Sequence, residues 1–109
     1  MNVDERIKKA LEPVVAVVEP NSYDGKELEY IVFNYTELPT AYGDDSPKAI
    51  RYMIQIHWFL PADPSPYPKK RKIKGALTGA GFLYPTVTNA SDGDGQHYIF
   101  ETEWLDGIL

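Results

Sequence analysis

The chain has 109 residues, of which 43% are hydrophobic and 25% charged, and it contains no cysteine. These values are typical of one globular domain with a modest core, so we expect a single domain over residues 1–109. They exclude a disulfide framework, a thiolate metal site and a cysteine nucleophile. No apolar run approaches the roughly 20 residues that cross a bilayer, and residues 1–10 lack the apolar stretch of a secretion signal, so we expect no membrane partner.

Charge is distributed unevenly along the chain. Eleven basic and sixteen acidic residues give a formal net charge of −5, and five of the basic residues fall between positions 69 and 74. Without that run, six basic residues stand against sixteen acidic ones, and so acidic a body would repel phosphate backbones. We therefore expect no sequence-specific nucleic-acid partner.

The first predicted element is an amphipathic helix over residues 2–12, where apolar side chains recur at helical spacing. Asn2 is a suitable N-cap, and Glu5, three residues later, completes a capping box. Pro13 disfavours helical geometry at the preceding residue and ends the helix.

Three strands are predicted next. Residues 14–19 and 28–36 are dense in β-branched and aromatic residues, and residues 38–47 are expected to form a loop. Residues 49–60 alternate between two faces. One face is apolar and is expected to lie in the core: Tyr52, Ile54, Ile56, Trp58 and Leu60. The other is mixed, and the pattern leaves open whether it is solvated or packs on another subunit: Arg51, Met53, Gln55, His57 and Phe59.

A stiff, proline-rich connection over residues 61–68 separates these strands from a second, short helix over residues 69–80. Ile73 and Leu77 lie on the apolar stripe of this helix, and Gly81 is suited to end it.

The last two strands, residues 82–88 and 96–105, are expected to form a hairpin around a turn at residues 89–95. The fold class is therefore α/β (α+β), in the order helix-strand-strand-strand-helix-strand-strand. We expect a mixed or antiparallel sheet of about four to five strands with two helices packed on it.

Catalytic and metal-binding patterns are weak in this sequence. His57 and His97 would meet over the sheet if their strands pair, but a metal site would need a third ligand such as Glu101 or Glu103. Partly exposed strand histidines are more common than such sites, so we predict no metal. No nucleophile has a base at a recognisable spacing, and no phosphate-binding loop is present, so we expect neither an enzyme nor a cofactor.

The acidic segment at residues 92–95 has part of the pattern of a calcium loop. The first ligand position of that pattern would fall on Ala90, which cannot bind a cation. The segment therefore predicts a Gly-Asp hairpin tip.

The basic run has two interpretations, a solvated helix face or a patch that contacts a partner. In identical copies it could meet a neighbour's acidic residues, and head-to-tail charge complementarity of this kind builds rings. The candidate interface residues are Tyr42, Asp44, Asp45, Lys69, Lys70, Arg71, Lys72, Lys74, Asp92 and Asp94.

The order of several stretches resembles the small tail terminator, or tail completion, proteins of long-tailed bacteriophages and prophages. The chain opens with a short charged helix over residues 4–11 and continues with Glu-Tyr-Ile-Val-Phe-Asn-Tyr at 29–35. Tyr-Gly-Asp-Asp at 42–45 then precedes the long strand at 51–59. Finally, Ala-Leu-Thr-Gly-Ala-Gly-Phe at 76–82 leads to His-Tyr-Ile-Phe-Glu-Thr-Glu-Trp at 97–104.

This resemblance implies a non-enzymatic virion protein at the junction of tail and neck, assembled in the bacterial host cytoplasm. Such proteins form a ring, usually a hexamer, that caps the head-proximal end of the tail tube, stops its polymerisation and joins tail to head. The implied partners are other copies of the chain, the tail tube protein and a head-completion or connector protein, with DNA passing through the ring. The alternatives are a head-completion or connector protein of the same virion and a small soluble binding domain or enzyme unrelated to virions.

Overall fold

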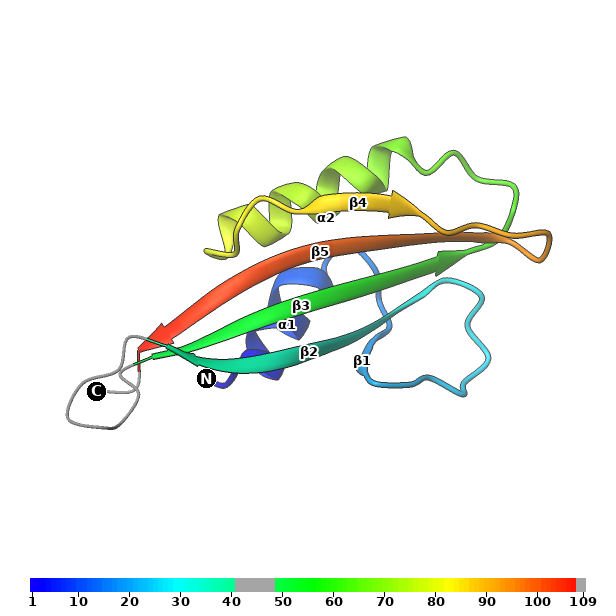
Figure 1. Ribbon diagram of the computed structural model, residues 1–109. Helices are drawn as coiled ribbons and strands as arrows, with labels where there is room; N and C mark the ends of the chain where they lie inside the picture. Colours follow the sequence, from blue (N-terminus) through cyan, green and yellow to red (C-terminus); the bar gives the residue numbers. More distant parts are fainter. Residues whose placement is uncertain (41–48, 108–109) are drawn as a thin grey trace.

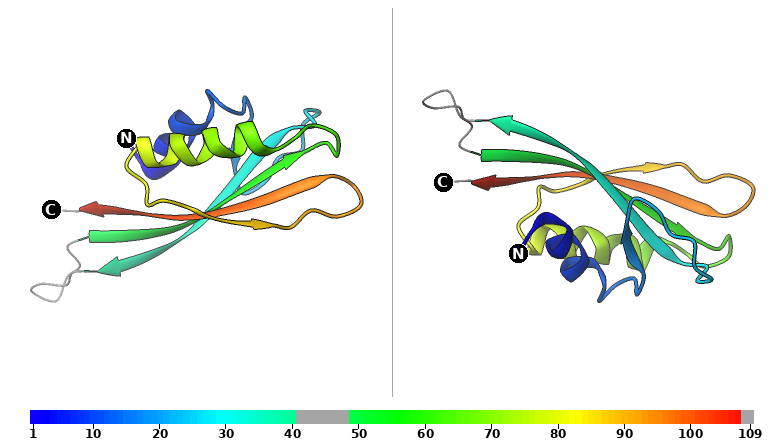
Figure 2. Two further views of the ribbon diagram at one scale, coloured as in Figure 1. Left: turned by 90° about the horizontal axis from the view of Figure 1, so that it is seen from above. Right: turned by 90° about the horizontal axis from the view of Figure 1, so that it is seen from below.

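The computed structural model describes residues 1–40 and 49–107 of the chain. Within them, five strands form one mixed sheet in the order β1-β2-β3-β5-β4, and two helices pack on one side of it (Figures 1 and 2). The expected α+β fold and its order of elements are confirmed. The elements are α1 (Val3–Leu11), β1 (Val18–Pro20), β2 (Tyr30–Thr40), β3 (Ala49–Leu60), α2 (Tyr67–Gly79), β4 (Thr86–Asn89) and β5 (Gln96–Gly107).

Helix α1 begins as the sequence predicts. The Asn2 side chain accepts a hydrogen bond from the backbone N–H of Glu5 at 2.8 Å, and the Glu5 carboxylate accepts one from the backbone N–H of Asn2. These two bonds satisfy donors that a helix start leaves free. The helix is also tied to the sheet, because the Tyr35 hydroxyl donates to the Asp4 carboxylate at 2.6 Å.

The bond between Tyr35 and Asp4 has a measurable consequence. It raises the pKa of Tyr35 from 10.0 to about 12, with burial as the next cause, because a phenolate beside a carboxylate loses the hydrogen bond and gains a repulsion. An absorbance titration of the phenolates should therefore contain a component near pH 12, and Asp4→Ala should move it back toward pH 10. An unchanged titration curve in that variant would mean that Asp4 does not hold the Tyr35 hydroxyl.

Strand β1 is shorter than expected. The sequence predicts a strand over residues 14–19, but after Pro13 the chain turns, and the N–H groups of Val14 and Val15 both donate to the Leu11 carbonyl. Only Val18–Pro20 pairs with β2, in parallel. Val15 is nevertheless 1% exposed, so its apolar character reflects burial in the turn rather than strand pairing.

Strand β2 is longer than expected. Residues 38–40 were predicted to lie in a loop, but they pair with residues 49–51 of β3. Pro39 is compatible with the strand for a specific reason. Along β2, the backbone groups of every second residue point away from β3. Those of Ile31 and Phe33 point this way and bond to the chain around β1, and Pro39 belongs to the same alternating set. Its missing N–H is therefore at the free edge. The rest of the predicted loop, residues 41–48, lies outside the described residues.

Helix α2 and strand β4 are also shifted from their predicted bounds. The helix begins at Tyr67 rather than residue 69, since Pro68 is tolerated in a first helical turn. Gly81 follows the C-cap with φ of +95°, as a helix-ending glycine should. Pairing of β4 starts only at Thr86, because the preceding Pro85 has no N–H to contribute to a ladder.

The core lies between the sheet and the two helices. The apolar face predicted for β3 is confirmed, with Ile54, Ile56, Trp58 and Leu60 buried. The register of the three long strands places Trp58 between Ile31 and Tyr98. No described helix covers the opposite side of the sheet, which we call the open face (Figure 2).

Candidate functional site

The open face consists of alternate residues of four neighbouring strands. Successive side chains of a strand point to opposite sides, so the residues between the buried ones face away from the helices. On β2 these are Tyr30, Val32, Asn34, Thr36 and Leu38; on β3 they are Arg51, Met53, Gln55, His57 and Phe59; on β5 they are His97, Ile99, Glu101, Glu103 and Leu105; and on β4 they are Thr86 and Thr88.

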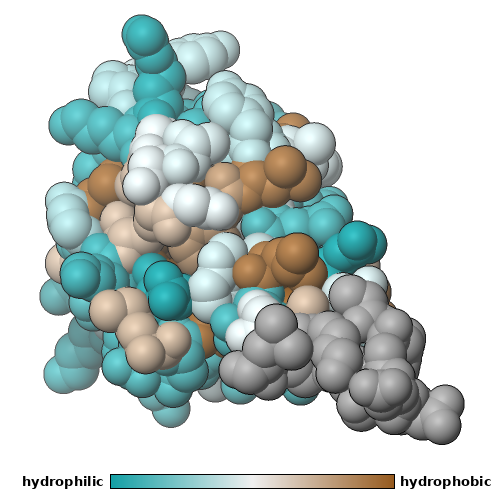
Figure 3. Space-filling view, turned by 90° about the vertical axis from the view of Figure 1, so that its left-hand side faces the viewer, coloured by the Kyte–Doolittle hydropathy of each residue, from teal (hydrophilic) through white to brown (hydrophobic). Residues whose placement is uncertain are grey.

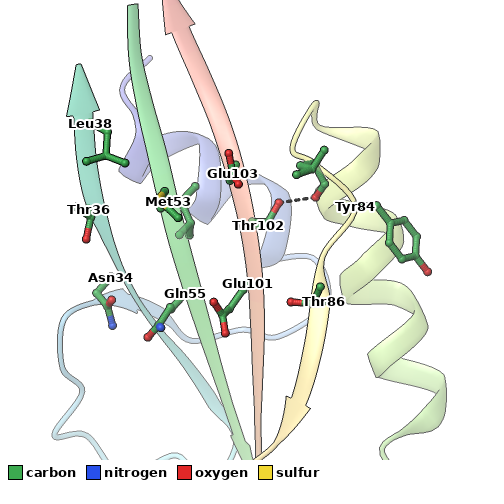
Figure 4. A pocket seen from close by; sticks show the side chains of 12 residues that line it. Asn34, Thr36, Leu38, Met53, Gln55, Tyr84, Thr86, Glu101, Thr102 and Glu103 are labelled. Carbon is green, nitrogen blue, oxygen red and sulfur yellow. Dashed lines mark hydrogen bonds between the residues drawn. The ribbon is translucent and has the colours of Figure 1, made fainter. Parts of the chain in front are cut away.

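One part of the open face is a shallow depression of about 550 Å³ (Figure 4). Its lining comes from β2, β3, β4, β5 and the segment before β4. The charged groups at its edge are Glu101 and Glu103, and Glu103 forms an ion pair with Arg51 at 3.6 Å. The other polar groups of the lining are the side-chain amides of Asn34 and Gln55 and the hydroxyls of its threonine and tyrosine residues.

Apolar side chains gather at one end of this face. Figure 3 shows hydrophobic surface there among hydrophilic groups. The exposed fractions of the side chains range from 39% to 60%, and a group of large apolar residues in water is typical of a contact surface. We call this group the terminal patch: Leu38, Met53, Leu83 and Leu105.

At the other end, aromatic and histidine rings form a row across the strands. The ring centroids of Tyr30 and Phe59 are 4.9 Å apart, and those of Phe59 and His97 are 4.1 Å apart. The predicted meeting of the two histidines is confirmed, with His57 Nδ1 and His97 Nε2 separated by 2.9 Å. With the Gln55 amide oxygen accepting from His57 Nε2–H at 3.1 Å, His57 Nδ1 accepts from His97 Nε2–H.

The histidine pair stands without a third metal ligand. Across residues 1–40 and 49–107, no three or more histidine and carboxylate side chains are grouped to hold a metal ion. Glu101 and Glu103, the ligands considered from the sequence, therefore do not complete a site with His57 and His97.

The histidine pair should make stability depend on pH. Burial lowers the pKa of both imidazoles below 6.5, and for His57 the neighbouring His97 lowers the pKa further. At acidic pH the unfolded chain therefore binds more protons than the folded chain. The contribution of the two neutral imidazoles to the free energy of unfolding is fully present above pH 6.5 and is lost as the pH falls through 6.5 toward their lower folded-state pKa values. Urea unfolding between pH 8 and 5 should show this loss, and a variant with His57→Asn and His97→Asn should show a smaller one. Parallel profiles for the two proteins would contradict it.

The five basic residues predicted as an interface divide into two groups. Lys69 donates to the Glu29 carboxylate at 2.6 Å, and the Lys70 ammonium lies 4.5 Å from the centre of the Tyr98 ring. Lys74 lies 5.9 Å from the Tyr84 ring. Three of the five cations are therefore engaged within their own chain, whereas Arg71 and Lys72 are exposed.

Two of the acidic candidates are among the described residues, and both lie between β4 and β5. Asp92 and Asp94 form the tip of the β4–β5 hairpin, where the Asp92 carboxylate accepts from the Asp94 N–H at 2.9 Å, as the sequence predicts. Both residues line a second depression, of about 530 Å³, together with Tyr30 and Phe59 of the open face. The remaining candidates, Tyr42, Asp44 and Asp45, lie outside the described residues.

Sequence reasoning missed two features of this surface. The role of Glu29, whose carboxylate accepts from both Trp58 Nε1–H and Lys69, has no local sequence signal because its partners are 29 and 40 residues away. The place of Tyr30 on the open face could have been found, since Ile31 and Phe33 alternate with it as core residues.

The chain matches no protein-family model, and no curated protein matches it. Within the part of the chain that the structure describes, neither helix is long and apolar enough to cross a membrane.

Proposed function

We propose that the chain is a phage or prophage tail terminator. It would form a ring on the head-proximal end of the tail tube, end tube polymerisation and present a surface to the head-completion or connector protein. The proposal is supported by the ordered stretches that resemble this family, from the charged helix at residues 4–11 to the strand at 97–104. It is also supported by the α+β fold that the resemblance implies.

The observation that carries the proposal is the open face. The three longest strands bury one side beneath the helices and leave the other side with the terminal patch and the row of aromatic rings. Monomeric proteins rarely leave such surfaces in water. A subunit that uses one face of its sheet for stability and the other for contact suits an assembly better than a free-standing module.

The charge of the chain is compatible with a ring through which DNA passes. The formal net charge is −5, and the basic residues at 69–74 lie on one helix. An acidic lumen would repel phosphates and so let DNA slide without binding. The proposed partners are therefore other copies of the chain, the tail tube protein and the head-side connector.

The test is electron microscopy of particles made by a phage that lacks the gene. We expect overlong tails that are separate from filled heads, with normal tails restored by a plasmid copy of the gene. Normal-length tails beside leaking heads would move the protein to the head side of the neck and overturn the proposal. Intact, infectious virions would also overturn it.

The open face can be examined in the same experiment. A plasmid copy with Met53→Lys places a charge in the terminal patch without touching the buried face of β3. We expect this variant to fold, as judged by circular dichroism, and to leave tails overlong. A copy with Lys9→Glu, an exposed site on α1, is the matched control and should restore normal tails.

A further inference from the structure

We propose that the acidic depression at the β4–β5 end of the open face binds the outer side of α2 from a second copy of the chain. In this contact, Arg71 and Lys72 of the second copy lie against Asp92 and Asp94. The inference rests on the proposed ring assembly and names the contact that builds it.

The depression has the chemistry to hold a long cationic side chain. Its lining includes the apolar rings of Tyr30 and Phe59, and its carboxylates come from Glu27, Asp92 and Asp94. Arginine and lysine bury their methylene stems on apolar surface while their charged ends reach polar groups. A volume of about 530 Å³ accommodates more than one such side chain.

The exposed side of α2 supplies the complementary charge. The helix contains no acidic residue, and its buried side chains Ile73 and Leu77 fix which side faces the core. Lys69, Lys70 and Lys74 are engaged by Glu29 and by aromatic rings of their own chain. The described residues contain no ion pair that involves Arg71 or Lys72, so these two cations are available to a partner.

The α2 helix of one copy does not fill the depression of the same copy. Helix α2 packs on the covered side of the sheet, whereas Tyr30, Phe59 and His97 of the depression belong to the open face (Figure 2). The contact is therefore between copies, and it joins two different surfaces. A contact of this kind closes into a ring or continues as a filament.

The open face is broad enough for such a contact. The molecule measures 54 by 26 by 23 Å along its principal axes. This length leaves room beside the depression for further contact, since a standard interface buries roughly 800 Å² on each partner. Opposite charges on the two surfaces would orient the approach and disfavour stacking of like faces.

The test uses two charge-reversed forms of the full chain. The rim variant carries Asp92→Lys and Asp94→Lys, and the helix variant carries Arg71→Glu and Lys72→Glu. Native mass spectrometry and light scattering over a concentration series should give a closed oligomer for the original chain. Each variant alone should keep its circular dichroism spectrum and dissociate at a concentration at least tenfold higher.

The decisive step is rescue. A chain that carries all four substitutions has a basic rim and an acidic helix, so its oligomer should return. An equal mixture of the rim and helix variants should also assemble, because alternating copies again present opposite charges. In a closed ring this alternation needs an even number of subunits. A variant with Lys8→Glu and Lys9→Glu on α1 changes the net charge by as much as the helix variant and should leave assembly unchanged.

The outcomes separate this inference from the proposed function. If the charge-reversed chains form rings as readily as the original, or if the four-substitution chain fails to recover, the contact is not the one described here. A chain that remains monomeric at millimolar concentration also overturns the inference. If the rescue works but a phage that lacks the gene makes normal tails, the contact stands and the terminator role does not.

Discussion

Replacing Trp58 with alanine should lower the free energy of unfolding by about 3–5 kcal/mol, the usual cost of truncating a buried aromatic residue. The indole is 0% exposed and lies 5.6 Å from the Tyr98 ring and 6.3 Å from the Phe100 ring, between centroids. Its removal leaves a cavity and leaves the Glu29 carboxylate without its Trp58 Nε1–H donor. Urea unfolding followed by circular dichroism would measure the loss.

Phe59→Ala is the matched control, because the next residue on the same strand lies on the open face. It should cost much less than Trp58→Ala, since Phe59 packs on Tyr30 and His97 at the surface rather than in the core. If Trp58→Ala lowers stability by less than about 1 kcal/mol, the side of β3 that faces the helices has been assigned wrongly.

Replacing Ile7 with alanine should be the second large effect, with a loss of about 2–5 kcal/mol. Ile7 is 0% exposed, on the stripe of α1 that also contains Val3 and Leu11. A helix of nine residues is too short to be stable by itself, so its packed face rather than its helix propensity holds it in place. Thermal and urea unfolding should agree on the size of the loss.

The control for Ile7 is Lys9→Ala on the exposed side of the same helix. Alanine is a good helix former and Lys9 buries no core surface, so the expected change is within about 0.5 kcal/mol. Equal effects at the two positions would mean that α1 does not pack on the sheet through this stripe.

The sequence was sufficient where a local rule and burial agree. The alternation in β3 assigned Trp58 to the core, and the Asn2–Glu5 pair marked the start of α1. It failed where two causes produce the same pattern. The apolar residues at 14–17 were predicted to form a strand, but the chain turns there and Val15 is the one of the four that is buried. Pro39 was predicted to lie in a loop. A proline fits this strand because its nitrogen is at the free edge, and the sequence does not show which neighbour each backbone group faces.

The candidate site was predictable in part for the same reason. The basic run and the acidic turn could be seen in the sequence, as could the pairing of His57 with His97. The sequence could not show which cations are engaged, because the Glu29 partner of Lys69 and the Tyr98 partner of Lys70 are distant in the chain. That division narrows the proposed contact to Arg71 and Lys72.

Pro39 also affects whether a strand from another molecule can pair with the free edge of β2. Strand β1 pairs with only three residues of β2, so the outer edge of β2 beyond Phe33 has no partner strand among the described residues. An exposed edge can recruit a strand from another molecule and begin a fibril. Pro39 removes an outward N–H from that edge, so a recruited strand would lack a donor there. The edge therefore disfavours open-ended sheet extension, and assembly is directed to the faces of the sheet, where a closed structure can form.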